Sequence, residues 1–389
     1  MDFYSEAKDM KDELTENRRY FHKNAEVGLD MPIAQEYVMT KLTEYGLEPK
    51  KCGHGVTALL GQGAPVLLLR ADMDALPMEE MSGESFACTG GHAHACGHDF
   101  HAAMLLSAAK LLKQSESQLK GTVKLMFQPA EETFEGSHDM IENGILENPH
   151  VDAALAFHVA PGNMLPGLFM YNAGGVMMNS VDGFHIDIKG KGGHGAYPNL
   201  SVDPLNIAAQ IYIALEELIA READPEKTCV LTVGQLHGGN AANIIPDCAF
   251  MEGTLRTNDK DEREKLVQRI SETAKGIAAV YGGTAEITVL SDVPPLICDK
   301  AFTEEMAGYM NELGIAKPFP DMKANASEDF AVIAEAVPSA FMYLSAGFTD
   351  ERGDYSAHNP KVRFNEDVLP IGAAGLAHCA VRWLEEHSK

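Results

Sequence analysis

Apolar positions follow two kinds of spacing along the chain, one typical of strands and one typical of helices. Residues 66–69 and 153–157 are unbroken apolar runs, the pattern of strands buried on both faces, and residues 123–127 alternate as a strand does. Apolar residues at helical spacing follow Asp99, which is placed to cap the helix they predict. Strands that alternate with helices predict an α/β fold with a mostly parallel central sheet flanked by helices.

Three of the predicted strands lead into polar residues. The first leads into Asp72 and Asp74, the second into Glu131 and Glu132, and the third into His158. In open α/β sheets the ligand site lies beyond the carboxyl ends of the strands. We therefore expect these side chains to meet on one rim of the sheet.

The middle of the chain follows another order. Its pattern is strand, helix, strand, strand, helix, strand, at residues 184–188, 203–220, 229–236, 248–256, 261–279 and 285–290. This βαββαβ order predicts a ferredoxin-like α+β domain inserted into the first. We expect one domain from residues 1–183 and 294–389, and a second from residues 184–293.

Composition narrows the classes of protein. The net charge of −26 disfavours nucleic acid and membrane partners and leaves a small-molecule substrate. The N-terminus lacks the pattern of a signal peptide, and no apolar stretch is long enough for a membrane span. Seven scattered cysteines favour reduced thiols. We expect a cytoplasmic protein.

A tract of histidines surrounds one cysteine. His92, His94, His98 and His101 lie within ten residues around Cys96. Such tracts favour metal, and thiolate with imidazole suits Zn²⁺. The alternative is a histidine-rich surface loop.

Carboxylates next to this tract offer further chemistry. Adjacent side chains point in different directions, so one of Glu131 and Glu132 can bind metal while the other acts as a base. Asp72 and Asp74 face the same side of an extended segment and can orient a histidine ligand. Taken singly, each of these residues also fits a turn or a solvated loop.

Nine motifs in order resemble those of the dinuclear-metal aminoacylase/carboxypeptidase superfamily. Among its members, the sequence is most similar to hippurate hydrolases, N-acyl-L-amino acid amidohydrolases and auxin-conjugate hydrolases. The motifs are RADMDALP, HACGHDFHA, QPAEE, FHV, KGKGGHGAYP, NIIPD, GTLR, SEDF and HNP with FNEDVLP. They span nearly the whole chain.

The resemblance implies a catalytic domain interrupted by a lid and dimerisation domain, and hence a homodimer. It implies two divalent metal ions per subunit, Zn²⁺ or Mn²⁺ first and Co²⁺ or Ni²⁺ as alternatives. The metal ligands it implies are Cys96, His98, Glu132, His158 and His358, with Cys96 bridging the ions. We assign His98 and His158 to one ion, and Glu132 and His358 to the other.

The resemblance also implies roles outside the ligand set. Glu131 becomes the general base, and the lid residues His194, Asn243 and Arg256 approach the substrate. The reaction it implies is hydrolysis of N-acyl amino acids, hippurate-like or N-acetylated, to a carboxylic acid and a free amino acid. Phe100 is larger than the residue common at its position, and we expect it to narrow the acyl side.

Three other functions remain open, and a fourth does not fit. The first is a metal-dependent dipeptidase or carboxypeptidase of the same superfamily. Gly190, Gly192 and Gly195 spell the G-x-G-x-x-G of a nicotinamide-dependent dehydrogenase, but Pro198 follows closely and the helical pattern starts only near Asp203, so the dehydrogenase does not fit. Cys96 with His98 or His94 could form a cysteine hydrolase. The last is a metal-binding protein without catalysis.

Overall fold

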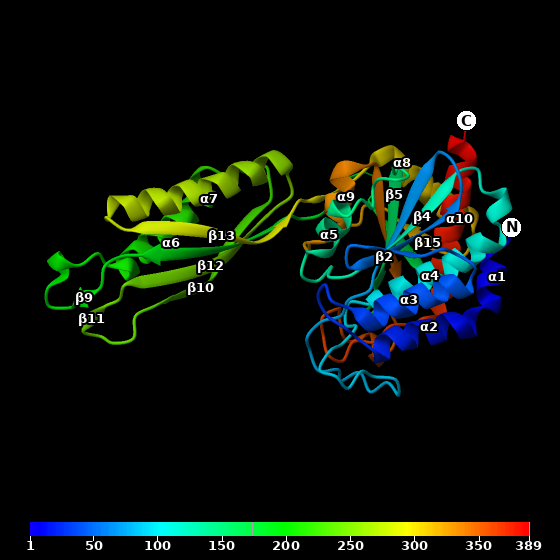
Figure 1. The fold of residues 1–389 in the computed structure, drawn as a ribbon, viewed down its shortest axis with the longest axis horizontal. Coiled ribbons are helices and arrows are strands. Elements are labelled where there is room, and N and C mark those ends of the chain that lie inside the picture. The colour runs from blue at the N-terminus through cyan, green and yellow to red at the C-terminus, as the bar shows by residue number, and fades with distance from the viewer. Residues whose placement is uncertain (173, 389) are drawn as a thin grey trace. The chain divides into compact units, whose positions relative to one another are not determined.

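Unbroken apolar runs form the centre of the larger of two units into which the chain divides (Figure 1). The computed structural model describes residues 1–172 and 174–388. Unit 1 comprises Met1–Met177, Ile297–Lys323 and Asp329–Lys389, and unit 2 comprises Met178–Leu296 and Ala324–Glu328.

Unit 1 is built on an 8-stranded sheet of order β1-β2-β4-β3-β5-β16-β6-β15. The pairs β3–β4, β3–β5, β5–β16 and β6–β15 are parallel, and the other neighbours are antiparallel. Its strands are β1 (Lys50–Cys52), β2 (Gly55–Gly61), β3 (Val66–Asp72), β4 (Thr122–Gln128), β5 (Ala153–Ala160), β6 (Leu168–Tyr171), β15 (Lys317–Phe319) and β16 (Ser339–Ser345). The expected mostly parallel sheet is confirmed.

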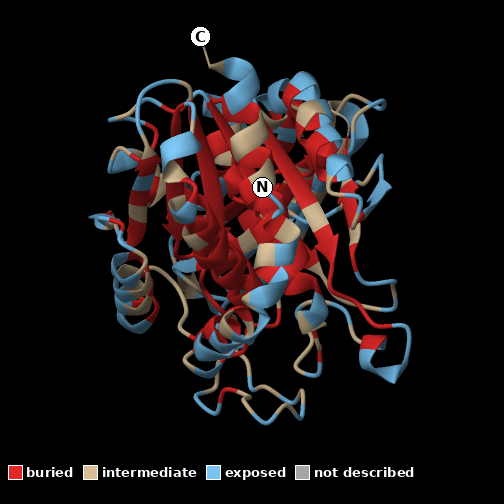
Figure 2. Ribbon diagram, turned by 90° about the vertical axis from the view of Figure 1, so that its right-hand side faces the viewer, coloured by how far each residue is buried: buried red, intermediate tan, exposed pale blue. Residues whose placement is uncertain are grey.

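Helices cover this sheet and leave its central strands buried (Figure 2). Helices α4 and α10 pack together against β3 and β5, whereas α5 contacts β4 and α9 contacts β5 and β16. The helices of unit 1 are α1 (Phe3–Asp9), α2 (Lys11–Lys23), α3 (Pro32–Glu44), α4 (His98–Gln114), α5 (Gly136–Glu142), α8 (Lys300–Glu312), α9 (Phe330–Ala336) and α10 (Leu369–His387). Every residue of β3 and β4 is buried, including Lys124 in β4, although the alternating pattern of β4 is typical of a strand with one exposed face.

Unit 2 has the expected βαββαβ order. Its antiparallel sheet runs β10-β12-β8-β13, and its core joins one face of the sheet to two helices. The elements are β8 (Val181–Lys189), α6 (Pro204–Arg221), β10 (Cys229–Gly238), β12 (Cys248–Thr257), α7 (Lys260–Val280) and β13 (Thr284–Val293). A short sheet of unit 2 pairs β9 (Gly193–His194) with β11 (Ile244–Ile245). Another short sheet pairs β7 (Gly175–Met178) with β14 (Leu296–Cys298), and most residues of these two strands belong to unit 1. The inserted ferredoxin-like fold is confirmed.

One expected helix cap is wrong. Asp99 lies inside α4, and Gly97, with a φ of 97°, is the N-cap residue. The Asp99 carboxylate instead contacts Arg18 Nε at 2.7 Å and His22 Nδ1 at 2.8 Å. The Asp99 carboxylate therefore bonds to a buried cation and a buried histidine, and it does not cap the helix as the sequence spacing predicted.

Candidate metal centre

The carboxyl ends of three parallel strands bring the candidate residues to one edge of the sheet in unit 1. Asp72 is the last residue of β3 and pairs in register with Gln128, the last residue of β4. Glu131 follows β4 after three residues, and His158 lies two residues before the end of β5. The strand pairing therefore places residues from three distant motifs on one rim.

Gly97 shapes the loop that carries Cys96 and His98. Its φ of 97° is unfavourable for any side chain, and an added Cβ would lie 2.4 Å from Val159 Cγ2 and 2.9 Å from Phe364. Cys96 precedes this turn, and His98 follows it in the first turn of α4. Gly97 thus lets both donors face the end of β5.

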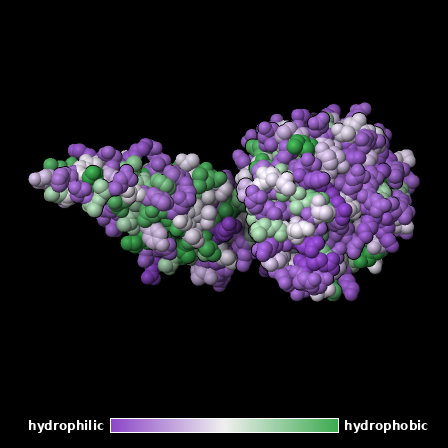
Figure 3. Space-filling model, turned by 90° about the horizontal axis from the view of Figure 1, so that it is seen from below, coloured by the Kyte–Doolittle hydropathy of each residue, from purple (hydrophilic) through white to green (hydrophobic). Residues whose placement is uncertain are grey.

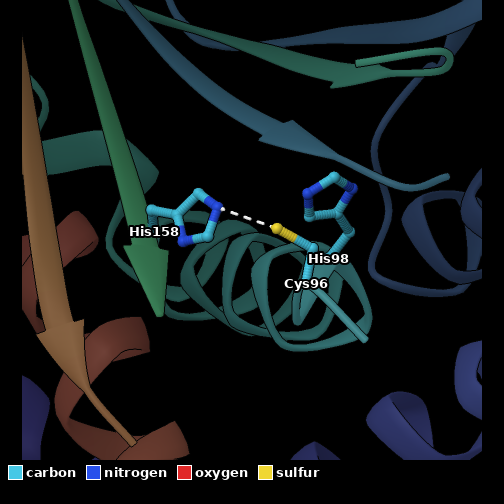
Figure 4. Close-up of side chains that lie close together, drawn as sticks. All are labelled: Cys96, His98 and His158. Carbon is cyan, nitrogen blue, oxygen red and sulfur yellow. Dashed lines mark hydrogen bonds between the residues drawn. The ribbon is translucent and has the colours of Figure 1, made fainter. Parts of the chain in front are cut away.

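Five potential metal donors form two groups that share one atom. The donor atoms of Cys96, His98 and His158 lie within 4.8 Å of one another, and so do those of Cys96, Glu132 and His358. His158 Nε2 lies 3.5 Å from Cys96 Sγ (Figure 4), and His358 Nε2 lies 3.4 Å from Glu132 Oε1. Other donor groups overlap with these two, among them His98 with Glu131 and Glu132, so the division between two ions stays a prediction.

Hydrogen bonds orient two of the histidine rings. The Nδ1–H of His98 donates to Asp74 Oδ1 at 3.1 Å, and the Nδ1–H of His158 donates to the Val159 carbonyl at 2.8 Å. These bonds assign the proton to Nδ1 and leave the Nε2 lone pairs facing the other donors. Asp74 also accepts the Glu132 backbone N–H at 3.0 Å.

The donor set fits a metal ion. His98 Nε2 and Glu132 Oε1 are buried, and neither has a hydrogen-bond partner among the described residues. Buried polar atoms without partners are costly, and a cation would satisfy both. Sulfur, imidazole nitrogen and carboxylate oxygen together suit Zn²⁺ and neighbouring divalent metals.

Burial sets the charge of two donors. It raises the pKa of the Cys96 thiol to about 12, and it lowers the pKa of His158 well below the usual range. His158 is therefore neutral, as a metal ligand must be.

His101 belongs to the same histidine tract but has both ring nitrogens engaged. Its Nδ1 donates to Asp72, and its Nε2 accepts the Val159 N–H at 2.8 Å. Burial, opposed by Asp72, lowers the pKa of His101 and keeps it neutral. It therefore ties β3 to β5 and is not a free metal donor.

Two of the residues with a strained backbone are a donor or lie beside the proposed base. Ala130 and His358 have φ angles of 53° and 63°, a region that residues with a Cβ rarely adopt. Ala130 immediately precedes Glu131. Such strain gathers at functional sites, where it holds side chains in directions that a relaxed chain would not choose.

The three candidate residues of the inserted domain lie in unit 2. His194 on β9 pairs with Ile244 on β11, and the Asn243 carbonyl accepts the Gly195 N–H at 2.9 Å. Arg256 lies on β12 and donates from Nη1 to Ser327 Oγ at 2.8 Å. The structure therefore brings His194 and Asn243 together at adjoining short strands.

One sequence interpretation is wrong, and the rejection of the dehydrogenase agrees with the structure. Phe100 is fully buried between Phe364, at a ring distance of 5.5 Å, and the Arg18 guanidinium, so it cannot line an acyl pocket. The glycines at positions 190, 192 and 195 do not open a helix, because α6 begins only at Pro204. A dinucleotide fingerprint needs a helix N-terminus directly after its glycines, so the dehydrogenase alternative fails.

Sequence reasoning missed one set of residues at the rim. Three buried side chains bond to one another beside Asp72 and Glu131, and they are those of Arg70, Gln128 and Asp329. Arg70 was visible as a charge at the end of an apolar run, and Asp329 as part of SEDF. The 259 positions that separate them gave no signal that they meet.

Among the described residues, no helix combines the length and apolar character that a membrane crossing needs. A family model described as peptidase family M20/M25/M40 matches residues 68–382. The chain is 37% identical over 399 residues to the IAA-amino acid hydrolase ILR1-like 5 of Arabidopsis thaliana, covering 99% of this chain and 90% of the relative. It is 35% identical over 379 residues to the N-acetyl-L-cysteine deacetylase of Bacillus subtilis, covering 96% and 88%.

A solved structure agrees with these matches. The dinuclear metal binding peptidase from family M20 of Bacillus subtilis superposes with a TM-score of 0.80 at 32% identity. The match covers 97% of this chain and 99% of that one.

Proposed function

The chain belongs to peptidase family M20/M25/M40, and on that premise we propose that it hydrolyses N-acyl amino acids, hippurate-like or N-acetylated, to a carboxylic acid and a free amino acid. The observation that carries the proposal is the pair of donor groups that share Cys96, with the Glu131 carboxylate 3.9 Å from His98 Nε2. Two relatives, an IAA-amino acid hydrolase and an N-acetyl-L-cysteine deacetylase, are named for cleaving acyl or amino acid conjugates.

Five side chains would hold two divalent metal ions, Zn²⁺ or Mn²⁺ before Co²⁺ or Ni²⁺. Cys96, His98 and His158 would hold one, and Cys96, Glu132 and His358 the other. Bound there, the ions would supply a water of lowered pKa and a Lewis acid for the amide carbonyl.

Glu131 is the general base in this proposal. Its Oε2 lies 3.9 Å from His98 Nε2 and so faces the donor groups. The carboxylate takes a proton from the attacking water as the new C–O bond forms. It then delivers that proton to the amine nitrogen as the C–N bond breaks, which returns Glu131 to its starting state.

The inserted domain supplies the substrate contacts. His194 Nδ1 accepts the Ala196 N–H at 3.1 Å, which assigns the ring proton to Nε2 and lets it donate to the developing oxyanion. The Arg256 guanidinium and the Asn243 amide suit the carboxylate of an amino acid.

We further propose a homodimer formed through the inserted domain. Strand β10 is at one end of its sheet, and helix α6 packs beside it. Both carry exposed apolar side chains, of which Ile213 is 56% and Leu236 is 45% exposed. Hydrophobic side chains are visible on the surface of the inserted domain (Figure 3). An open strand edge next to apolar surface favours pairing with a second copy.

The test measures free amine released from a panel of N-acyl amino acids and dipeptides. The protein is supplied in three forms, namely metal-loaded, chelator-treated and reloaded with Zn²⁺ or Mn²⁺. We expect release that the chelator abolishes and added metal restores. Release from dipeptides alone would replace the proposal with a dipeptidase, and stoichiometric metal without release from any substrate would refute it.

A further inference from the structure

A buried polar cluster below the rim has no part in the chemistry proposed above. Asp329 accepts hydrogen bonds from Arg70 Nη2 at 2.9 Å, from Gln128 Nε2 at 2.7 Å and from the Ser137 backbone N–H at 2.9 Å. Gln128 Oε1 accepts from Arg70 Nε at 2.9 Å and from Ser137 Oγ at 3.0 Å. The exposure of all four side chains is 2% or less.

The cluster contacts Glu131 through Asp329, the member that lies farthest from Glu131 along the chain. The backbone N–H of Asp329 donates to Glu131 Oε1 at 3.4 Å, while Glu131 Oε2 faces His98. One oxygen of the proposed base is thus held from below, and the other is directed to the donor groups. A carboxylate held in this way cannot rotate to exchange its two oxygens without breaking the bond to Asp329.

The same cluster reaches the other side of the rim. Arg70 Nη1 donates to Asp72 Oδ2 at 2.7 Å, and Asp72 accepts from the His101 ring that ties β3 to β5. Arg70 therefore joins Asp329 to the strand that carries Asp72. Segments that are 259 positions apart in the chain are fixed by one guanidinium.

We propose that Asp329 is a positioning residue for Glu131, acting through the Arg70–Gln128–Ser137 cluster to hold one oxygen of the base and present the other. The inference rests on the proposed function of Glu131. It goes beyond that function because it assigns a task to the SEDF segment and to Arg70.

The chemistry of the cluster requires a carboxylate at this position. Three donors converge on its two oxygens, and a carboxylate accepts at both. An asparagine would turn its NH₂ group toward at least one of those donors. Asp329→Asn should therefore loosen the cluster while it keeps the size of the side chain.

The kinetic test uses metal-loaded Asp329→Asn. We expect two equivalents of bound metal, KM within about threefold of the wild type and kcat lowered at least about tenfold, because a displaced base affects the proton transfer. Ser137→Ala removes only the hydroxyl bond to Gln128 and supplies a milder variant with a smaller loss of kcat. A loss of kcat that parallels loss of metal would overturn the proposal.

A compensating substitution separates positioning from general damage. Gln128→Glu alone would place two carboxylates 2.7 Å apart and lower kcat. In the double variant Gln128→Glu/Asp329→Asn, the amide donates to the new carboxylate, and the charge that faces Arg70 is unchanged. We expect kcat of the double variant to exceed that of each single variant, whereas additive losses would count against the proposal.

Hydrogen exchange needs no turnover, so it tests the positioning role of Asp329 separately from the proposed function. In metal-free protein, hydrogen exchange of the segment 129–137 should be at least about tenfold faster in Asp329→Asn than in the wild type. The matched control is Asp299→Asn, which makes the same loss of charge at an N-cap residue whose side chain accepts from Phe302 N, at the opposite end of the strands. Unchanged exchange in 129–137 would overturn the positioning role even if the wild type is active. A wild type without activity would refute only the proposed function.

Discussion

At the scale of single residues, one carboxylate directs two proposed metal ligands. Asp74 accepts from His98 Nδ1 and from the Glu132 backbone N–H, so it sets the tautomer of one ligand and the backbone of the other. Its side chain is buried, where each of these bonds is stronger than in water. Asp74 therefore acts on metal affinity without touching the ion.

This arrangement predicts the effect of Asp74→Ala. Loss of an orienting partner typically lowers metal affinity about 10- to 100-fold, and we expect a loss in that range by competitive titration with a chelator. Asp139→Ala is a matched control, because Asp139 also accepts from a histidine Nδ1 and a backbone N–H, at the more exposed His54. Equal losses in the two variants would contradict an orienting role for Asp74.

Glu131→Gln separates binding from turnover. The amide has nearly the size of the carboxylate but cannot take a proton, so we expect two equivalents of metal and a fall in kcat of at least about 100-fold. Elemental analysis and amine release measure the two properties on one sample. Residual kcat within a few-fold of the wild type would remove Glu131 from the role of base.

A buried histidine with two carboxylate partners gives the stability of the fold a pH dependence. His22 donates to Asp99 and to Glu80, at 2.8 Å and 2.9 Å. Burial and the charge of Arg18 oppose protonation, but the two carboxylates outweigh them and raise the pKa of His22 above its usual value. A raised pKa means that the charged pair stabilises the fold fully below pH 6.5, and that this stability declines as pH rises through the folded pKa.

The variant His22→Gln tests that sign. We expect the free energy of unfolding of the wild type to exceed that of the variant most at about pH 6, and the excess to shrink toward pH 9. Urea unfolding at several pH values measures it. His150→Gln, at a more exposed histidine beside Glu147, serves as the control and should show little change. An excess that grows with pH would contradict the assignment.

At the scale of elements, local pattern predicted most of what forms. The runs at 66–69 and 153–157 became β3 and β5, because a strand buried on both faces must be apolar throughout. The cap of α4 was mispredicted, because Asp99 has a buried partner, Arg18, from a helix far earlier in the chain. A prediction from local sequence, such as a helix cap, fails where the residue has a stronger partner from a distant part of the chain.

Gly97→Ala tests the turn that separates Cys96 from His98. The added Cβ meets both an unfavourable φ and the Val159 side chain, so we expect the free energy of unfolding to fall by about 2–4 kcal/mol. Gly144→Ala is the matched control, with a φ of 83° but open space around the new Cβ. It should lose only about 1 kcal/mol. Equal losses in both would mean that the close approach at Gly97 contributes nothing.

At the scale of the whole molecule, the proposed dimer predicts a change of mass. Ile213→Asp and Leu236→Asp each place a charge in the exposed apolar surface of α6 and β10, and we expect the pair to yield a monomer in sedimentation equilibrium. Val280→Asp, at the end of α7 with 81% exposure, should leave the mass unchanged. A wild-type monomer, or a dimer that survives both substitutions, would contradict this interface.

The overall division into a sheet and an inserted domain followed from the order of elements, and so did the rim where the candidate residues meet. The strand order did not follow, because β16 lies between β5 and β6 although it is the last strand among the described residues. The Arg70–Asp329 cluster was hidden for the same reason. Pairings between distant segments depend on the whole fold, and short windows of sequence do not record them.

The position of β16 also bears on the order of events during synthesis. The ribosome adds roughly 5–20 residues per second, and about 180 residues separate the end of β5 from the start of β16. The hydrogen-bonding edge of β5 therefore stays open for roughly 10–40 seconds while the inserted domain is made. During that interval the nascent chain exposes an apolar strand edge to its neighbours, and a holding chaperone has its clearest target there.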